Sequence, residues 1–444
     1  MLPPIVLLAV AGLGQPPQTI SAATRTRSPI RHIVVVYMEN HSFNDVLGKL
    51  CVIDRRCNGT TTGRLLDGSS IPLAQATDRV PEIGHGTRAT LRAVNNGGMN
   101  GFESVLHCAA ADGYPCYSQY GPHQIPNLAA LARSFVISDM TFNSSAYSSW
   151  VSHIALAAAT KDGFQGNIPK VSQFHQRGPG WGCDSFMDAY WTPSGGGDYV
   201  LVPSCIPDKT GFGPYRESPV QWVPTIMDRM DHAGRSWRID GGEGTLDTSV
   251  GTGYAWSTCP AFADCLYTSQ VEKFRPASAI LKQAEIGRLP ALTLVTPTYK
   301  TSQHNNTSML MGDNWIGSVA GAIMSGPQWS STAIFITYDD CGCFYDPVPP
   351  PNGFGIRSPM VIVSPYAKPG FTDSTVASTN SILAFIEHTF NLRPLGTGDA
   401  AAYDYSRSFD FTQPPPPNPL MTHTSIPRGE RRWLARQPDR EGVT

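Results

Sequence analysis

Two continuous apolar runs constrain the fold more strongly than any other feature of the chain. The first covers residues 32–38 (HIVVVYM) and the second residues 333–338 (AIFITY). Runs without polar alternation are typical of strands that are covered on both faces, as in parallel sheets. Shorter apolar runs predict two more strands, at residues 292–295 and 360–363.

Helical patterns lie between these runs, at residues 125–135, 150–159, 315–325 and 381–390. Strands that alternate with helices indicate an α/β fold. We therefore predict a mostly parallel sheet that is sandwiched by helices.

The 444 residues suffice for one large domain or two ordinary ones. We predict a signal peptide at 1–24, an α/β domain at 25–412 and a loosely attached C-terminal tail at 413–444. The tail contains a proline run and a basic stretch. Residues 165–275 are rich in Gly, Pro, Trp and Cys and lack periodicity, so we expect a loop-rich, disulfide-containing insertion or cap there.

The N-terminus and the cysteines both favour export. The apolar run at the N-terminus is too short to span a bilayer, and residues 21–23 offer a cleavage site, although the usual basic start is missing. Close cysteine couples are typical of local disulfides in an oxidising compartment. The ten cysteines form five such couples: Cys51/Cys57, Cys108/Cys116, Cys183/Cys205, Cys259/Cys265 and Cys341/Cys343.

We therefore expect a secreted or periplasmic protein. For Cys341 and Cys343, so short a ring strains a disulfide, and a pair of free thiols beside the active site is the alternative. The net charge of -2 and the lack of a nucleic-acid-binding basic run give no reason to expect a nucleic-acid partner. No obligate protein partner is inferred.

Each of the two best strands is followed by residues with oxygen ligands. Glu39 and Asn40 follow the first strand, and Asp339 and Asp340 follow the second. Ligand sites of open α/β sheets lie beyond the carboxyl ends of the strands. Clustered carboxylates repel one another unless a cation neutralises them, so we predict one divalent metal ion of unspecified identity. The alternative is that these residues cap helices or form turns.

Ser149 opens an apolar helical segment that ends near Thr160. Backbone N–H groups at a helix N-terminus favour phosphate, so Ser149 is a candidate nucleophile. His153 lies one turn later on the same face. Plain helix capping is the alternative role for the serine.

His85 and His304 lie in loops rich in polar residues, glycine or asparagine. Loop histidines are better catalytic candidates than histidines on apolar faces, although a hydrogen-bonding role is the commoner one.

Four segments carry a family resemblance: residues 33–43 (IVVVYMENHSF), 84–102, 338–351 (YDDCGCFYDPVPPP) and 355–370. They resemble the bacterial phosphoesterase family that includes phospholipases C and acid phosphatases, a branch of the alkaline-phosphatase-like superfamily. The resemblance runs in order from about residue 31 to residue 411.

The resemblance implies site residues as well as a fold. Glu39, Asn40, Asp339, Asp340 and the nucleophile Ser149 would bind the metal. Ser148 and Ser152 remain alternatives for the nucleophile.

His85 and His304 would contact phosphate oxygens or the leaving group, with His153 a further catalytic candidate. The chain departs from the family pattern at Cys343, where Gly is usual, and at Pro347, where His is usual. Val151 and Ser152 stand where Pro and Asn are common.

The implied function is a secreted, metal-dependent hydrolase of phosphate esters that acts through a phosphoserine. The substrate would be a phosphomonoester or a phospholipid, the latter with a transient membrane-surface contact. Alternatives are a catalytically impaired binding homologue, a sulfate-ester hydrolase and a disulfide-rich envelope protein. Residues 149–153 lack the Cys/Ser-x-Pro/Ala-x-Arg setting of sulfatases, and the metal-ligand set argues against the envelope protein.

Overall fold

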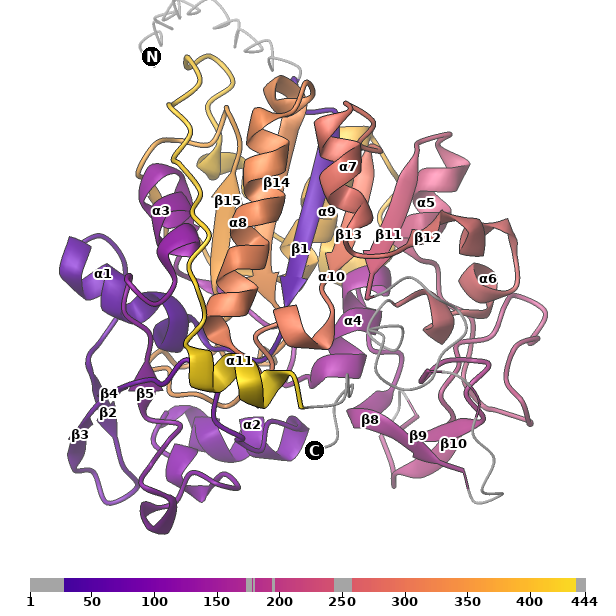
Figure 1. Cartoon of the computed structure of the whole chain (residues 1–444). Coiled ribbons are helices and arrows are strands. Elements are labelled where there is room, and N and C mark those ends of the chain that lie inside the picture. Colours follow the sequence, from indigo (N-terminus) through magenta and orange to yellow (C-terminus); the bar gives the residue numbers. More distant parts are fainter. Residues whose placement is uncertain (1–27, 173–177, 179, 194–195, 243–257, 437–444) are drawn as a thin grey trace, which may run out of the picture.

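A computed structural model of the chain describes residues 28–172, 178, 180–193, 196–242 and 258–436 (Figure 1). The signal peptide predicted at 1–24 lies outside these residues. None of the helices within the described ranges is both long enough and apolar enough to cross a bilayer.

An eight-stranded sheet forms the centre of the molecule, with the strand order β12-β11-β13-β1-β14-β15-β6-β16. Strand β15 runs antiparallel to both of its neighbours, whereas the other pairings in this sheet are parallel. The prediction of a mostly parallel sheet is confirmed. The strands are β12 (Phe274–Arg275), β11 (Trp237–Gly241), β13 (Leu292–Thr296), β1 (His32–Met38), β14 (Thr332–Tyr338), β15 (Met360–Val363), β6 (Val136–Ser138) and β16 (Thr372–Asp373).

The two strongest apolar runs are the adjacent central strands β1 and β14. Their side chains are buried apart from that of His32. The register pairs Val34 with Ile334 and Met38 with Tyr338. The two strands therefore end level with each other, and the residues that follow them emerge side by side.

Helices cover both faces of the sheet (Figure 1). Helix α8 (Met309–Ser325) lies in front of the sheet with α3 (Pro126–Ser134) and α7 (Ala279–Glu285) beside it, and α9 (Thr379–Phe390) lies behind the sheet. Helix α4 (Ser149–Ala158) packs against α9. The remaining helices are α1 (Lys49–Asp54), α2 (Thr87–Val94), α5 (Ile226–His232), α6 (Ala263–Leu266), α10 (Thr397–Ala400) and α11 (Arg428–Leu434).

The four predicted helices correspond to α3, α4, α8 and α9. Helix α8 begins six residues earlier than expected, because Ser308 caps it by accepting a hydrogen bond from the backbone N–H of Met311. Its first two turns carry Gly312, Asp313 and Asn314, which hide the apolar periodicity.

The range 165–275 does not stand wholly apart from the central sheet. Strands β11 and β12 lie inside it and form one end of that sheet. The mixed sequence of β11, with Arg238 and Asp240 between apolar residues, gave no strand signal. Three strands of the range form a separate antiparallel sheet, β8 (Phe164–Val171), β9 (Met187–Trp191) and β10 (Val200–Pro203).

The described residues also form three two-stranded sheets. They pair β2 (Thr62–Arg64) with β3 (Ser70–Pro72), β4 (Ala74–Gln75) with β5 (Ser118–Gln119), and β7 (Thr141–Phe142) with β17 (Ala377–Ser378).

Four of the five cysteine couples are disulfides: Cys51–Cys57, Cys108–Cys116, Cys183–Cys205 and Cys259–Cys265. The fifth couple, Cys341 and Cys343, consists of buried free thiols whose Sγ atoms lie 3.0 Å apart. Of the two alternatives for Cys341 and Cys343, the structure therefore shows the pair of free thiols.

Residues 413–436 are fastened to the domain rather than loosely attached. Thr424 and Asn314 of α8 exchange two hydrogen bonds, of 2.8 and 2.9 Å. Thr422 exchanges two more with Asn127 of α3, of 2.9 and 2.7 Å. These bonds use backbone groups of an irregular segment, which leave no periodic pattern in the sequence.

Candidate active site

The ends of β1 and β14 bring the two predicted acidic couples together. Glu39, Asn40, Asp339 and Asp340 are each at most 1% exposed. The Asn40 backbone N–H donates to Asp339 Oδ1 at 2.7 Å, and the Gly342 N–H donates to Asp340 Oδ1 at 2.7 Å. The level strand ends thus convert two distant sequence motifs into one cluster.

The carboxylates of this cluster destabilise each other's charged forms. Burial, and then the neighbouring Asp339 carboxylate, raise the pKa of Glu39 well above its usual value. Burial, and then the charges of Asp339 and Cys341, raise the pKa of Asp340 in the same direction. A bound cation would offset both effects, so this cluster could hold one.

Ser149 is the first residue of α4, after the N-cap residue Ser148. Its Oγ lies 3.1 Å from the Asn40 amide oxygen and 3.4 Å from Asp340 Oδ2. The Ser148 hydroxyl donates instead to the carbonyl of Gly166. Of these two candidate nucleophiles, Ser149 is therefore the one in contact with the acidic couples.

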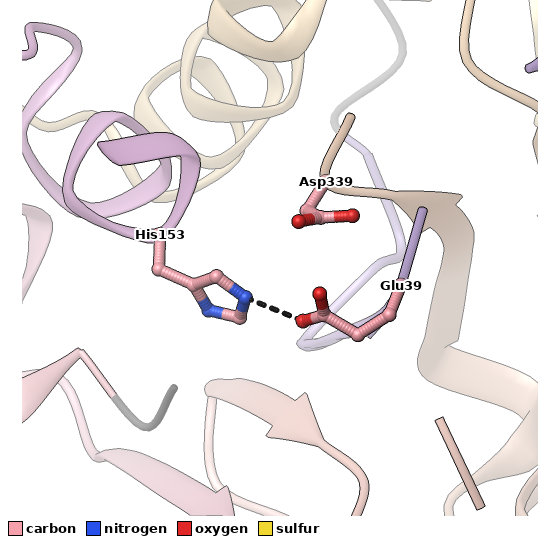
Figure 2. A group of neighbouring side chains, drawn as sticks. All are labelled: Glu39, His153 and Asp339. Atoms are coloured by element: carbon pink, nitrogen blue, oxygen red, sulfur yellow. Dashed lines mark hydrogen bonds and ion pairs between the residues drawn. The ribbon is translucent and has the colours of Figure 1, made fainter. Parts of the chain in front are cut away.

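His153 lies one turn further along α4 and points toward the same cluster. Its Nε2 is 2.9 Å from Glu39 Oε1, and donor atoms of Glu39, His153 and Asp339 all lie within 4.8 Å of one another (Figure 2). The ring is 1% exposed, and the Tyr37 ring packs edge-on against it at 4.9 Å. The helical spacing predicted that His153 shares a face with Ser149, but not that it contacts Glu39.

His85 and His304 meet on the other side of the Asn40 side chain. The Asn40 amide nitrogen lies 2.8 Å from Nε2 of His304 and 3.2 Å from Nε2 of His85. The Nδ1 atoms lie 2.7 Å from the Ile83 carbonyl oxygen for His85 and 3.1 Å from the Asn305 carbonyl oxygen for His304. Because a carbonyl oxygen can only accept, we assign the protons of both neutral rings to Nδ1.

This assignment fixes the orientation of the Asn40 amide. Both Nε2 atoms then accept, so the NH₂ group of Asn40 faces the histidines and the amide oxygen faces the carboxylates. The oxygen lies 3.1 Å from Asp339 Oδ1 and 3.2 Å from Asp340 Oδ1. Turning the amide around would require a proton on Nε2 of both rings. An amide oxygen held against two carboxylates is the arrangement that a shared cation stabilises.

Burial keeps both histidines neutral in the ligand-free protein. It lowers the pKa of His85. Burial and the adjacent His85 lower the pKa of His304 to about 3. A phosphate dianion bound against the rings would favour their protonated forms.

Two asparagines support the site and were missing from the sequence prediction. Asn143 Nδ2 donates to the Asp339 carbonyl at 2.7 Å. Asn305 Nδ2 donates to the Ile83 carbonyl at 2.8 Å, which links the loops of His85 and His304. Asn305 follows His304 directly, but nothing in the sequence indicates which distant loop its side chain reaches.

A model of the phosphoesterase family matches residues 30–393 of the chain. A non-hemolytic phospholipase C of Burkholderia pseudomallei is 27% identical over 284 residues, which cover 49% of this chain and 40% of that protein. Phospholipase C B of Mycobacterium tuberculosis is 25% identical and covers 89% of this chain and 81% of that protein. Non-specific phospholipase C6 of Arabidopsis thaliana is 23% identical, covering 82% and 69%.

The match thus spans less than half the length of the Burkholderia protein. A solved structure described as a protein in the alkaline phosphatase superfamily from Vibrio parahaemolyticus aligns with a TM-score of 0.39 at 11% identity, over 85% of this chain and 71% of that one. The family match covers most of the chain and includes the strand ends and α4. The names of the relatives support a phosphoric ester hydrolase. The chain belongs to the phosphoesterase family.

Proposed function

We propose that the chain is an exported, metal-dependent hydrolase of phosphate esters in which Ser149 is the nucleophile. The observation that carries this proposal is the contact between Ser149 Oγ and the cluster at the strand ends, 3.1 Å from Asn40 and 3.4 Å from Asp340. A serine that only capped the helix would have no reason to face buried carboxylates.

Glu39, Asn40, Asp339, Asp340 and Ser149 would hold one divalent cation. The donor set consists of carboxylate, amide and hydroxyl oxygens. Burial and neighbouring negative charges raise the pKa values of Glu39 and Asp340, and a cation would offset both effects. Such a cation lowers the pKa of a bound hydroxyl and neutralises charge on a phosphate oxygen.

The Ser149 hydroxyl gives up its proton to Asp340 or to solvent, and Oγ attacks the phosphorus atom. The alcohol leaves with the electrons of the broken P–O bond, so that a phosphoserine forms. Water then cleaves the phosphoserine and regenerates the hydroxyl. The N-terminus of α4 presents backbone N–H groups to the phosphate during both steps. The alcohol oxygen takes up a proton as it departs.

His85 and His304 would contact the phosphate from the opposite side of Asn40. Binding of the phosphate would favour a proton on Nε2 of one ring, and that ring could then protonate the leaving oxygen. The Asn305 side chain keeps the two loops together. The histidines thus supply protons, while the strand ends supply the nucleophile.

The names of the relatives favour a phospholipid over a phosphomonoester as substrate. The four disulfides favour a secreted or periplasmic location. A phospholipid substrate would bring the enzyme into transient contact with a membrane surface.

Hydrolysis of p-nitrophenylphosphorylcholine and p-nitrophenyl phosphate tests this proposal, with and without chelator. We expect turnover of at least one compound, its loss with chelator and its loss in Ser149→Ala. Faster turnover of the choline ester would favour a phospholipase C, and the reverse would favour a phosphatase.

Activity that survives both chelator and Ser149→Ala would refute the mechanism. A cation-loaded protein without turnover would indicate a binding homologue, and selective cleavage of p-nitrophenyl sulfate a sulfate-ester hydrolase.

A further inference from the structure

The His153 side chain is built into the acidic cluster from a different element than its other members. Glu39 and Asp339 come from strand ends, whereas His153 reaches them from the second turn of α4 (Figure 2). Its ring and the two carboxylates point toward one another, and all three side chains are buried.

The distances suit donors that share one ion. Donors around an octahedral cation at about 2.1 Å lie about 3.0 Å apart when adjacent and about 4.2 Å apart when opposite. His153 Nε2 lies 2.9 Å from Glu39 Oε1, and the Asn40 amide oxygen lies 3.1 Å from Asp339 Oδ1. Donor atoms of Glu39, His153 and Asp339 all lie within 4.8 Å of one another, so the three side chains could reach one ion.

We infer that Nε2 of His153 is a direct ligand of the cation held by Glu39, Asn40, Asp339, Asp340 and Ser149. This inference rests on the metal centre of the proposed function and adds a nitrogen donor to it. A set of carboxylate, amide and hydroxyl oxygens suits magnesium, calcium or manganese, whereas an imidazole shifts preference toward manganese, iron, cobalt or zinc. The site therefore selects a transition metal over magnesium and calcium.

Metal binding at Nε2 changes the protonation of the ring. In the metal-free protein the hydrogen bond to Glu39 places a proton on Nε2 or on the carboxyl group. Coordination through Nε2 would require the lone pair of that nitrogen, so the proton would lie on Nδ1 or pass to solvent. The competing explanation is an ion pair with Glu39, in which His153 never touches the metal.

Pulsed electron paramagnetic resonance of the Mn²⁺-loaded full chain distinguishes these explanations without measuring activity. Coordinated imidazole gives a ¹⁴N modulation that changes when histidine is labelled with ¹⁵N. We expect this modulation in the wild type and in His304→Gln, a control that removes a nearby imidazole, and its loss in His153→Gln. Competition titrations should show Mn²⁺ affinity falling on the order of 10-fold or more in His153→Gln, with a smaller change for Mg²⁺.

Stoichiometric Mn²⁺ binding that Asp339→Asn abolishes, without ¹⁴N modulation in the wild type, would overturn the inference and leave the proposed function standing. Modulation that persists in His153→Gln would also overturn it. Failure of any divalent cation to bind would instead refute the proposed function itself. If His153→Gln does not fold, the wild-type and His304→Gln spectra still decide whether a histidine other than His304 coordinates the ion.

Discussion

Two regions of the molecule bury carboxylates against each other, and different groups surround the carboxylates in each. Glu387 of α9 and Asp399 of α10 are at most 1% exposed. Backbone N–H groups of Leu395 and Gly396 donate to the Asp399 carboxylate at 2.6 and 2.9 Å. Burial, and then the hydrogen bond and charge of Asp399, raise the pKa of Glu387 to about 8.

At the ends of β1 and β14 the carboxylates meet ligand atoms as well as N–H donors. The Asn40 amide oxygen, the Ser149 hydroxyl and the His153 imidazole all face them. Buried acidic residues alone therefore do not indicate a metal. The strand-end cluster, unlike Glu387 and Asp399, is surrounded by oxygen and nitrogen atoms that could ligate a cation.

The largest expected difference between the regions is in catalysis. Asp339→Asn should lower kcat/KM by about 10³-fold or more, because it removes a charged ligand beside the nucleophile. The matched variant Asp399→Asn should retain activity within a few-fold. Steady-state hydrolysis of p-nitrophenylphosphorylcholine measures both. Equal losses in the two variants would mean that the comparison reflects stability rather than chemistry.

The histidines and the carboxylates on either side of Asn40 should have different roles, and a His304 variant tests this. His304→Gln should lower kcat by about 10²-fold, because it removes a proton donor to the leaving group. Its metal content should stay at the wild-type level. Kinetics and elemental analysis of the same preparation measure the two quantities. If His304→Gln loses metal together with activity, His304 is one of the metal ligands, and the proposed separation of proton donors from metal ligands is wrong.

Removal of the cation should destabilise the protein through the strand-end cluster. A ligand at a hundred times its Kd adds about 2.7 kcal/mol to the free energy of unfolding. All three proteins are first stripped of metal with a chelator. We then expect Mn²⁺ to raise the Tm of the wild type and of Glu387→Gln by the same amount, and to change the Tm of Glu39→Gln little. An equal shift in Glu39→Gln, measured by differential scanning fluorimetry, would place the cation elsewhere.

The smallest expected effect is the pH dependence at Glu387. Its folded-state pKa of about 8 lies above the ordinary value of 4.5. The resulting stabilisation is fully present below about pH 4.5 and is lost as the pH rises through about 8. Glu387→Gln lacks this titration, so its Tm relative to the wild type should rise by about 2 °C between pH 5 and pH 9. A constant Tm difference would show that Glu387 does not hold a proton.

Much of the fold was predictable because its central strands and main helices carry strong periodic patterns. The runs at 32–38 and 333–338 became β1 and β14, and Ser149 became the first residue of α4. Strand β11 was missed because Arg238 and Asp240 interrupt its apolar character. The course of residues 413–436 was missed because side chains such as Asn127 and Asn314 fasten it through backbone contacts.

The amino-acid sequence by itself determined the strand ends that carry the acidic couples, the start of helix α4 at Ser149 and the cysteine spacing that forms local disulfides. These are local properties, set by apolar periodicity and short separations along the chain. Only the tertiary structure decided that Asn40 lies between two histidines and two carboxylates, and that His153 meets Glu39. The residues that these contacts join are separated by 45 to more than 260 positions along the chain. They meet through loops and helix faces whose orientation depends on the packing of the whole domain.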